Sequence, residues 1–191
     1  MSWRNKMPFE PEITISHAGF HVFDMDVMVN FFKTIYGLSV TDRGVLGKRG
    51  EITFLGADPR DHHQLVLYSG RTSRTGVHYN HVSFRVNKLN RLRLIHSNLL
   101  NYEGITNIKT INHGVAWSVY CSDPEGNRTE AFVESPWYVS QPYEVELDLK
   151  LKDEKIHDLT KLMIDEDQSS KPIEIWREEY IKTLNPRYGT N

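Results

Sequence analysis

The sequence has little cysteine, no long hydrophobic run and no excess of charge of one sign. Its single cysteine, Cys121, excludes an internal disulfide framework and is typical of a reducing compartment. No apolar run approaches the roughly 20 residues of a transmembrane helix, and residues 1–6 are not followed by the apolar segment of a signal peptide. We therefore expect a cytoplasmic protein without a membrane partner.

The charge balance excludes further classes of protein. Lysine and arginine total 23 and aspartate and glutamate total 25, which gives a formal net charge of −2. This balance provides no basic surface of the kind that binds nucleic acid or anionic lipid. Apolar residues at 39% and charged residues at 25% of 191 positions predict a globular protein, with one domain or two small modules sharing a core.

The first half of the chain predicts a β-α-β-β-β unit. Residues 13–23 alternate apolar and polar side chains as a strand does. Asp24 is placed to cap a helix, and Gly37 is placed to end it. Glycines and an Asp-Pro pair then separate three further strands, which we expect at residues 38–43, 51–56 and 63–68.

The same order begins again after a polar connection. Residues 81–86 predict a strand, and leucine and isoleucine at helical spacing over residues 89–100 predict a helix. Three more strands are expected at residues 107–111, 116–121 and 128–133. The two units begin about 64 residues apart, counting from His17 to His81. A repeat of this size indicates two copies that pair to build one core.

This organisation predicts an α+β fold. Two paired βαβββ modules are expected to form an open, β-barrel-like sheet, and a C-terminal extension with two short helices is expected to wrap the core. The predicted divisions are an N-terminal arm at residues 1–12, a domain at residues 13–134 with modules at 13–70 and 78–134, and the extension at residues 135–191.

A tight hairpin in the second unit carries a carboxylate that requires an explanation. The turn Asp123-Pro124-Glu125-Gly126-Asn127 has proline, glycine and asparagine where a tight turn uses them. On the returning strand Glu130 shares one face with Arg128 and Phe132. A bound metal would explain a carboxylate in the middle of such a strand. Cys121 points to the face opposite Tyr120, so we expect a buried small side chain there.

Two histidines stand at equivalent places in the repeat. His17 and His81 begin corresponding strands, and Glu130 lies on the last strand of the second unit. If the units pair about a local two-fold axis, two imidazoles and one carboxylate converge on one point, so that the open sheet is centred on a metal. This ligand set is typical of mononuclear non-haem Fe(II). A single strand histidine is usually a core or surface group, but three groups at repeat-related positions favour a metal.

These residues resemble those of the vicinal oxygen chelate superfamily, and within it the type I extradiol ring-cleaving dioxygenases, especially single-domain members acting on catechols or biphenyl-2,3-diol. Residues 120–130 resemble the family pattern Tyr-x-x-Asp-Pro-x-Gly-x-x-x-Glu, and the resemblance covers about residues 13–134. It implies that His17, His81 and Glu130 hold Fe(II), with Mn(II) or another divalent metal as the alternative.

The resemblance also implies roles for three residues around the metal. His63 lies in a segment similar to the one that carries the family's acid/base histidine, and an imidazole suits this role because its pKa lies near the working pH. His113 and Tyr120 resemble the histidine and tyrosine that hydrogen-bond the bound diolate. Here the spacing departs from the family, because His113 lies seven residues before Tyr120 rather than nine.

The implied function is Fe(II)-dependent extradiol cleavage of a catechol or 2,3-dihydroxybiphenyl-type diol with O₂, by a cytoplasmic homodimer. One alternative is another metal-dependent enzyme of the superfamily, a thiol transferase or an isomerase or lyase. Such enzymes generally lack the histidine pair found here at His62 and His63. A second alternative is a metal-free small-molecule binding protein of the same fold, a class that lacks the ligand triad.

Overall fold

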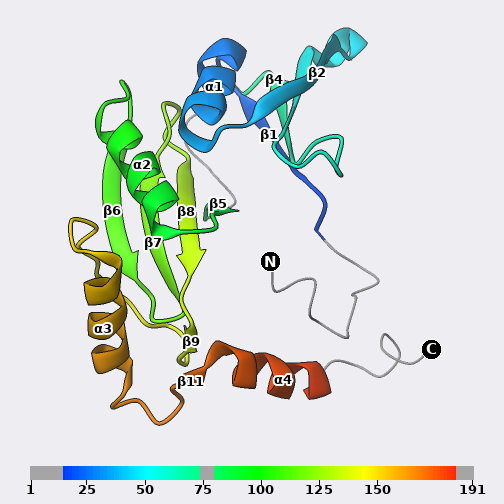
Figure 1. The fold of residues 1–191 in the computed structure, drawn as a ribbon. Helices are drawn as coiled ribbons and strands as arrows, with labels where there is room; N and C mark the ends of the chain where they lie inside the picture. Colours follow the sequence, from blue (N-terminus) through cyan, green and yellow to red (C-terminus); the bar gives the residue numbers. More distant parts are fainter. Residues whose placement is uncertain (1–14, 74–79, 184–191) are drawn as a thin grey trace.

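The computed structural model describes residues 15–73 and 80–183, which form two larger sheets, a small two-stranded sheet and the helices that accompany them (Figure 1). The arm predicted at residues 1–12 and residues 13–14 of the first predicted strand lie outside these ranges. So do residues 78–79 of the second predicted module and residues 184–191 of the predicted extension. Within the described ranges, no helix has both the length and the apolar character needed to cross a membrane.

The first sheet contains four strands in the order β1-β4-β3-β2, with β1 parallel to β4 and the other pairs antiparallel. Helix α1 (Met25–Phe31) continues as a π-helix, η2 (Phe32–Tyr36). Asp24 caps α1 by accepting a hydrogen bond from Val27 N, and Gly37 ends the helix at a φ of 74°. The remaining elements are β1 (Ala18–Val22), β2 (Ser39–Val45), the 3-10 turn η3 (Gly47–Arg49), β3 (Glu51–Gly56) and β4 (Leu65–Ser69).

The second sheet contains five strands in the order β10-β6-β7-β8-β5, and β5 runs parallel to β8. Helix α2 (Leu89–Leu100) follows β5, as the helical spacing predicts. The strands are β5 (Val82–Arg85), β6 (Thr106–Asn112), β7 (Ala116–Ser122), β8 (Arg128–Glu134) and β10 (Val145–Glu146). The predicted second βαβββ unit is therefore confirmed.

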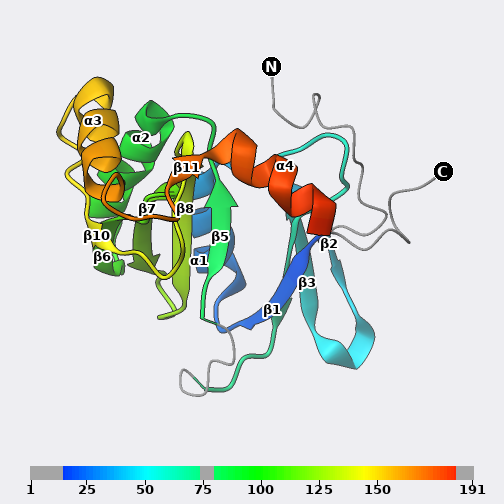
Figure 2. The ribbon, with the colours of Figure 1, turned by 90° about the horizontal axis from the view of Figure 1, so that it is seen from below.

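The two sheets are arranged as an open structure. Each sheet has the first strand of its module at an edge. These edge strands, β1 and β5, are on the sides of the two sheets that face each other (Figure 2). Among the described strands, none pairs with a strand of the other sheet. The α+β class and both βαβββ modules are confirmed, and the sheets are not closed into a barrel.

One hydrophobic core joins the two modules through their helices. Side chains of α1 and η2 pack with side chains of α2 and with one face of β7, and all belong to a single buried cluster. Tyr36 illustrates the junction, because its ring stacks on Phe84 of β5 with centroids 4.0 Å apart and its hydroxyl donates to Thr129 Oγ1 of β8 at 2.6 Å. Burial of this cluster supplies the main driving force that holds the modules together.

The extension begins by packing on the second sheet. After β9 (Trp137–Tyr138), helix α3 (Asp153–Ile164) lies along that sheet (Figure 1). The buried Thr160 Oγ1 of α3 accepts from Trp117 Nε1 at 2.8 Å and from Asn112 Nδ2 at 2.9 Å. These bonds satisfy two donors inside the core, where an unpaired donor would be costly.

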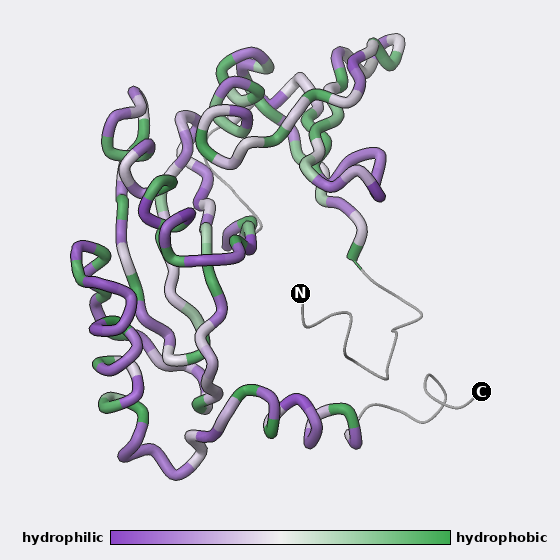
Figure 3. Tube along the Cα trace, viewed as in Figure 1, coloured by the Kyte–Doolittle hydropathy of each residue, from purple (hydrophilic) through white to green (hydrophobic). Residues whose placement is uncertain are grey.

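The last described helix has a different environment. β11 (Lys171–Pro172) pairs with β9 and leads into α4 (Ile173–Thr183), which extends away from the second sheet (Figure 1). Hydrophobic and hydrophilic residues alternate along α4 (Figure 3), and none of its residues is buried. Its attachment includes an ion pair between Arg177 and Glu134 of β8, with 3.1 Å between Nη2 and Oε2.

The hairpin turn of the second module binds the first module. Glu125 is 3% exposed, and its Oε1 accepts from the backbone N–H groups of Phe23 and Asp24, each at 2.8 Å. Arg71, which follows β4, donates to Asn127 Oδ1 at 2.8 Å and lies 3.4 Å from Glu125 Oε2. The turn therefore connects the start of α1 and the end of β4 to β8.

Replacing Glu125 should destabilise the whole domain. We expect E125A to lower the free energy of unfolding by about 2–4 kcal/mol, because two part-buried hydrogen bonds to a charged acceptor are lost together with its contact to Arg71. E125Q keeps an acceptor oxygen and should cost about half as much. Urea denaturation measures both changes. The exposed Glu103 provides a matched control, and an E125A variant as stable as E103A would contradict this role.

Candidate functional site

Two of the three predicted metal ligands meet on one face of the second sheet. Pairing of β8 with its neighbours places Glu130 opposite Tyr120 of β7 and opposite Ser83 of β5. Directly opposite residues share a face of the sheet. His81 immediately precedes β5, and its Nε2 lies 3.2 Å from Glu130 Oε2. The structure thus brings these two predicted ligands together, and their role as metal ligands stays a prediction.

Glu130 is a buried carboxylate surrounded by hydroxyl groups. Burial alone would raise its pKa, but nearby Ser118, Ser83 and Tyr120 outweigh this effect. His81 acts in the same direction, so that the pKa of Glu130 lies below its usual value. Ser83 Oγ donates directly to Glu130 Oε2. Glu130 is therefore anionic and held in a fixed orientation, as a metal ligand must be.

If His81 carries its proton on Nδ1, its contact with Glu130 lacks a hydrogen-bond donor. His81 Nδ1 lies 2.7 Å from Asn80 Oδ1, and an N–H on Nδ1 that donates to this oxygen leaves Nε2 as an acceptor. Nε2 then faces Glu130 Oε2, a second acceptor. A proton or a metal cation must lie between them. Two ligands about 2.1 Å from one metal, at right angles, are about 3 Å apart, so this donor pair fits a divalent metal.

The third predicted ligand lies on the other sheet. His17 precedes β1, and its ring centroid lies 4.5 Å from that of His63. In the part of the chain that the structure describes, no three or more His, Cys, Asp or Glu side chains are close enough together to hold a metal. The structure therefore brings His81 and Glu130 together and places His17 beside the predicted acid/base histidine.

His63 lies two residues before β4 in a cluster of rings. It contacts Phe54 at a centroid distance of 4.9 Å, and its Nδ1 lies 2.9 Å from His62 Nδ1. Burial lowers the pKa of His63, and the nearby His17 and His62 lower it further. His62 in turn approaches Asp42, with 3.5 Å between Nε2 and Oδ2. A lowered pKa keeps His63 neutral at physiological pH, in the form that accepts a proton.

His113 and Tyr120 form a hydrogen-bonded pair beside Glu130. His113 Nε2 lies 3.1 Å from the Tyr120 hydroxyl, and His113 Nδ1 lies 2.9 Å from the carbonyl oxygen of Tyr143. Only an N–H can bond that carbonyl, so Nδ1 donates to it, and in neutral His113 Nε2 accepts from Tyr120. Burial raises the pKa of Tyr120 well above its usual value. The Tyr120 hydroxyl therefore keeps its proton and can donate a hydrogen bond at physiological pH.

Several residues of this face do not follow from the local sequence pattern. Ser83 and Asn80 could be suggested by their places two residues after and one residue before His81, but Tyr143 acts through a contact that depends on the fold. Ser118 is fully buried, and its Oγ has no hydrogen bond of normal geometry among the described residues, although it is near enough to help lower the pKa of Glu130. Such an atom can accept a partner on the site face.

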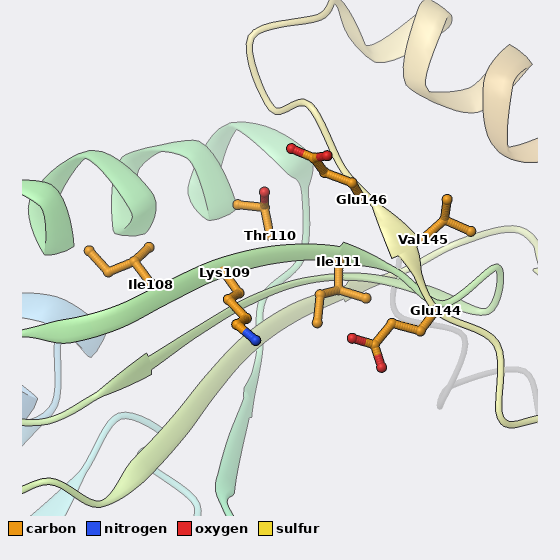
Figure 4. A pocket seen from close by; sticks show the side chains of 7 residues that line it. All are labelled: Ile108, Lys109, Thr110, Ile111, Glu144, Val145 and Glu146. Carbon is orange, nitrogen blue, oxygen red and sulfur yellow. The ribbon is translucent and has the colours of Figure 1, made fainter.

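One surface hollow lies apart from these residues. It has a volume of about 670 Å³ and lies where β10 covers part of the edge of β6 (Figure 4). Lys109, Ile111 and Glu144 point to one side of β6 in this view, while Ile108 and Thr110 point to the other. None of the predicted site residues lines the hollow, so it does not mark the chemical site.

Comparisons with known proteins agree with this fold. Residues 14–131 match the family model described as the Glyoxalase/Bleomycin resistance protein/Dioxygenase superfamily. The chain belongs to this superfamily. A comparison with curated protein sequences gives no match.

Solved structures with the same fold share little sequence with this chain. A glyoxylase/bleomycin resistance protein/dioxygenase domain from Frankia sp. EAN1pec is 18% identical with a TM-score of 0.55, covering 64% of this chain and 98% of its own. The fosfomycin resistance protein FosX from Listeria monocytogenes, complexed with Mn(II) and sulfate ion, is 14% identical with a TM-score of 0.50, covering 64% and 93%. A mutant form of that FosX, complexed with Mn(II) and 1S,2S-dihydroxypropylphosphonic acid, is 17% identical with a TM-score of 0.51, covering 64% and 90%.

Cys121 occupies the core side of the strand that carries Tyr120, as predicted. It is 1% exposed, and its Sγ lies 3.2 Å from Thr129 Oγ1. Burial raises the pKa of this thiol. We expect native protein at pH 8 to react with a thiol reagent at least about 100-fold more slowly than urea-unfolded protein, because the thiolate is the reactive form. Equal rates in the two states would contradict a buried Cys121.

Proposed function

We propose that this protein is an Fe(II)-dependent extradiol dioxygenase that cleaves a catechol or a 2,3-dihydroxybiphenyl-type diol with O₂. The observation that carries the proposal is the His81–Glu130 pair, in which two metal-binding atoms face one another at 3.2 Å beside the Tyr120–His113 pair. An anionic ligand, an imidazole and neighbouring groups for a diol are the parts that this chemistry needs.

The metal would be held by His81, Glu130 and His17. The first two already have hydrogen-bond partners that orient them, since Asn80 contacts the imidazole and Ser83 donates to the carboxylate. His17 would join them from the start of β1, the edge strand of the first sheet that faces β5 (Figure 2). It would come either from the same chain or from the second chain of a homodimer. When bound, the metal supplies a centre at which the diol and O₂ are held together and electrons can pass between them.

The residues of the chain would position the diol and move its proton. The Tyr120 hydroxyl, a donor with a raised pKa, would hydrogen-bond a diol oxygen that carries negative charge. His113 is fixed by the Tyr143 carbonyl, and because Tyr120 has a single proton, His113 would have to carry a proton on Nε2 and donate it to the Tyr120 oxygen while Tyr120 donates to the diol. His63, kept neutral by its lowered pKa, would accept a hydroxyl proton from the diol.

A second candidate function is a metal-dependent reaction on another substrate within the same superfamily. The Mn(II) named in the Listeria monocytogenes FosX structures favours it, as does the fit of the His81–Glu130 pair to any divalent metal. Mn(II) is accordingly the alternative to Fe(II) here. The two candidates differ in their need for a proton acceptor at His63 and for O₂.

The test begins with anaerobic purification and reconstitution with Fe(II) or Mn(II). We expect one metal per chain in the wild type and its loss in E130A, with E103A as the matched control. Oxygen uptake on adding catechol or 2,3-dihydroxybiphenyl should accompany formation of a yellow ring-cleaved product. H63F should bind metal normally but lower kcat by about 100-fold or more, as expected for loss of an acid/base group, whereas H96F on α2 should not.

The outcomes separate the candidates. Metal binding without oxygen uptake across a panel of catechols would overturn the dioxygenase proposal and leave the second candidate. Full metal occupancy in E130A would overturn the proposed ligand set, and so would a wild type that binds neither metal. An H63F variant as active as H96F would remove His63 from the reaction.

A further inference from the structure

A guanidinium group on the site face is held in place but not neutralised. Arg128 begins β8 and lies on the same face as Glu130, two residues away. Its Cζ lies over the Tyr120 ring, 4.2 Å from the ring centroid. Arg128 is exposed to solvent, whereas Tyr120 and Glu130 are buried. The positive charge therefore lies on the solvent-exposed side of the Tyr120 ring.

Arg128 differs in this respect from neighbouring arginines. Arg85 and Arg177, near the other end of β8, both form ion pairs with Glu134. Among the described residues, Arg128 has no carboxylate within ion-pair distance. The negative charge closest along its own face is Glu130, which is already occupied by His81 and Ser83. Among the described residues, the cation on the solvent-exposed side of Tyr120 is thus not neutralised by a carboxylate.

Stacking prepares this cation to bind an anion. A guanidinium held over an aromatic ring is already restrained, so it loses little further conformational freedom when its N–H donors bind a ligand. Its planar donor pair matches the two oxygens of a carboxylate. Two residues along a strand span about 7 Å, so a ligand held at Glu130 and Tyr120 can reach Arg128 with a substituent on its ring.

We propose that Arg128 binds a carboxylate of the substrate, so that the substrate class is an aromatic diol carrying a carboxylate on its ring or on a short side chain. The diol part of this inference rests on the proposed function. Recognition of the carboxylate rests on Arg128 and Tyr120 alone. In this arrangement the diol lies beside the Tyr120 hydroxyl, and the carboxylate points toward solvent, where it binds the Arg128 guanidinium.

The test is a comparison of two ligands that differ only in the carboxylate. Isothermal titration calorimetry under anaerobic conditions measures binding of 3,4-dihydroxybenzoate and of catechol to the Fe(II)-reconstituted protein, and to the metal-free protein in parallel. We expect the carboxylate ligand to bind about 10–100-fold more tightly to the wild type, the range for hydrogen bonds to a charged group.

Variants assign the preference to Arg128. R128Q should bring the ratio of the two affinities close to one, and R128K should retain part of it because lysine keeps the charge but lacks the planar fork. R43Q is the matched control, since Arg43 forms an exposed ion pair with Asp26 of the first module, and it should keep the wild-type ratio. Thermal unfolding of R128Q verifies that the variant is folded.

Two results would overturn the inference: equal affinity of the wild type for both ligands, or an unchanged ratio in R128Q. Oxygen uptake measured on the same samples separates this inference from the proposed function. An Arg128-dependent preference without oxygen uptake supports carboxylate recognition and overturns the dioxygenase. Cleavage of both ligands, with equal affinity for them, supports the dioxygenase and overturns carboxylate recognition by Arg128.

Discussion

The carboxylate of Asp123 inside the β7–β8 turn determines the geometry on which the site depends. It accepts from the backbone N–H groups of Glu125 and Asn127 and from the Asn127 side chain, at 2.8–2.9 Å. These bonds close the turn and set the register that places Tyr120 opposite Glu130. They also direct Glu125 away from the turn and onto the first module. One turn therefore fixes both the site face and the contact between modules.

Much of this arrangement could be predicted from the sequence because it is local. Turn residues determine where a hairpin reverses, and alternation along a strand then determines which side chains share a face. Asp24 and Gly37 similarly define the ends of the first helical segment. The repeat provided the remaining information, since it relates His17 to His81 and predicts two units of the same order.

The rest depends on how separate segments approach one another, which no local pattern encodes. The sequence predicts one convergent ligand set, but the distance of His17 from Glu130 depends on the placement of two sheets that share no strand pairing among the described strands. Likewise, the carbonyl that orients His113 comes from Tyr143, thirty residues later in the extension. Long-range packing decides such contacts, and the shortened spacing between His113 and Tyr120 gave no sign of this partner.

Central to the account is our proposal that one metal cation is bound by both His81 Nε2 and Glu130 Oε2, which lie 3.2 Å apart. A crystal structure of the anaerobic Fe(II)-loaded protein, with anomalous scattering measured at the iron edge, tests it most directly. We predict an iron peak about 2.1 Å from both atoms, with His17 of the same chain or of a second copy as the third protein ligand. An iron peak elsewhere, or His81 and Glu130 joined without iron in fully loaded protein, would contradict it.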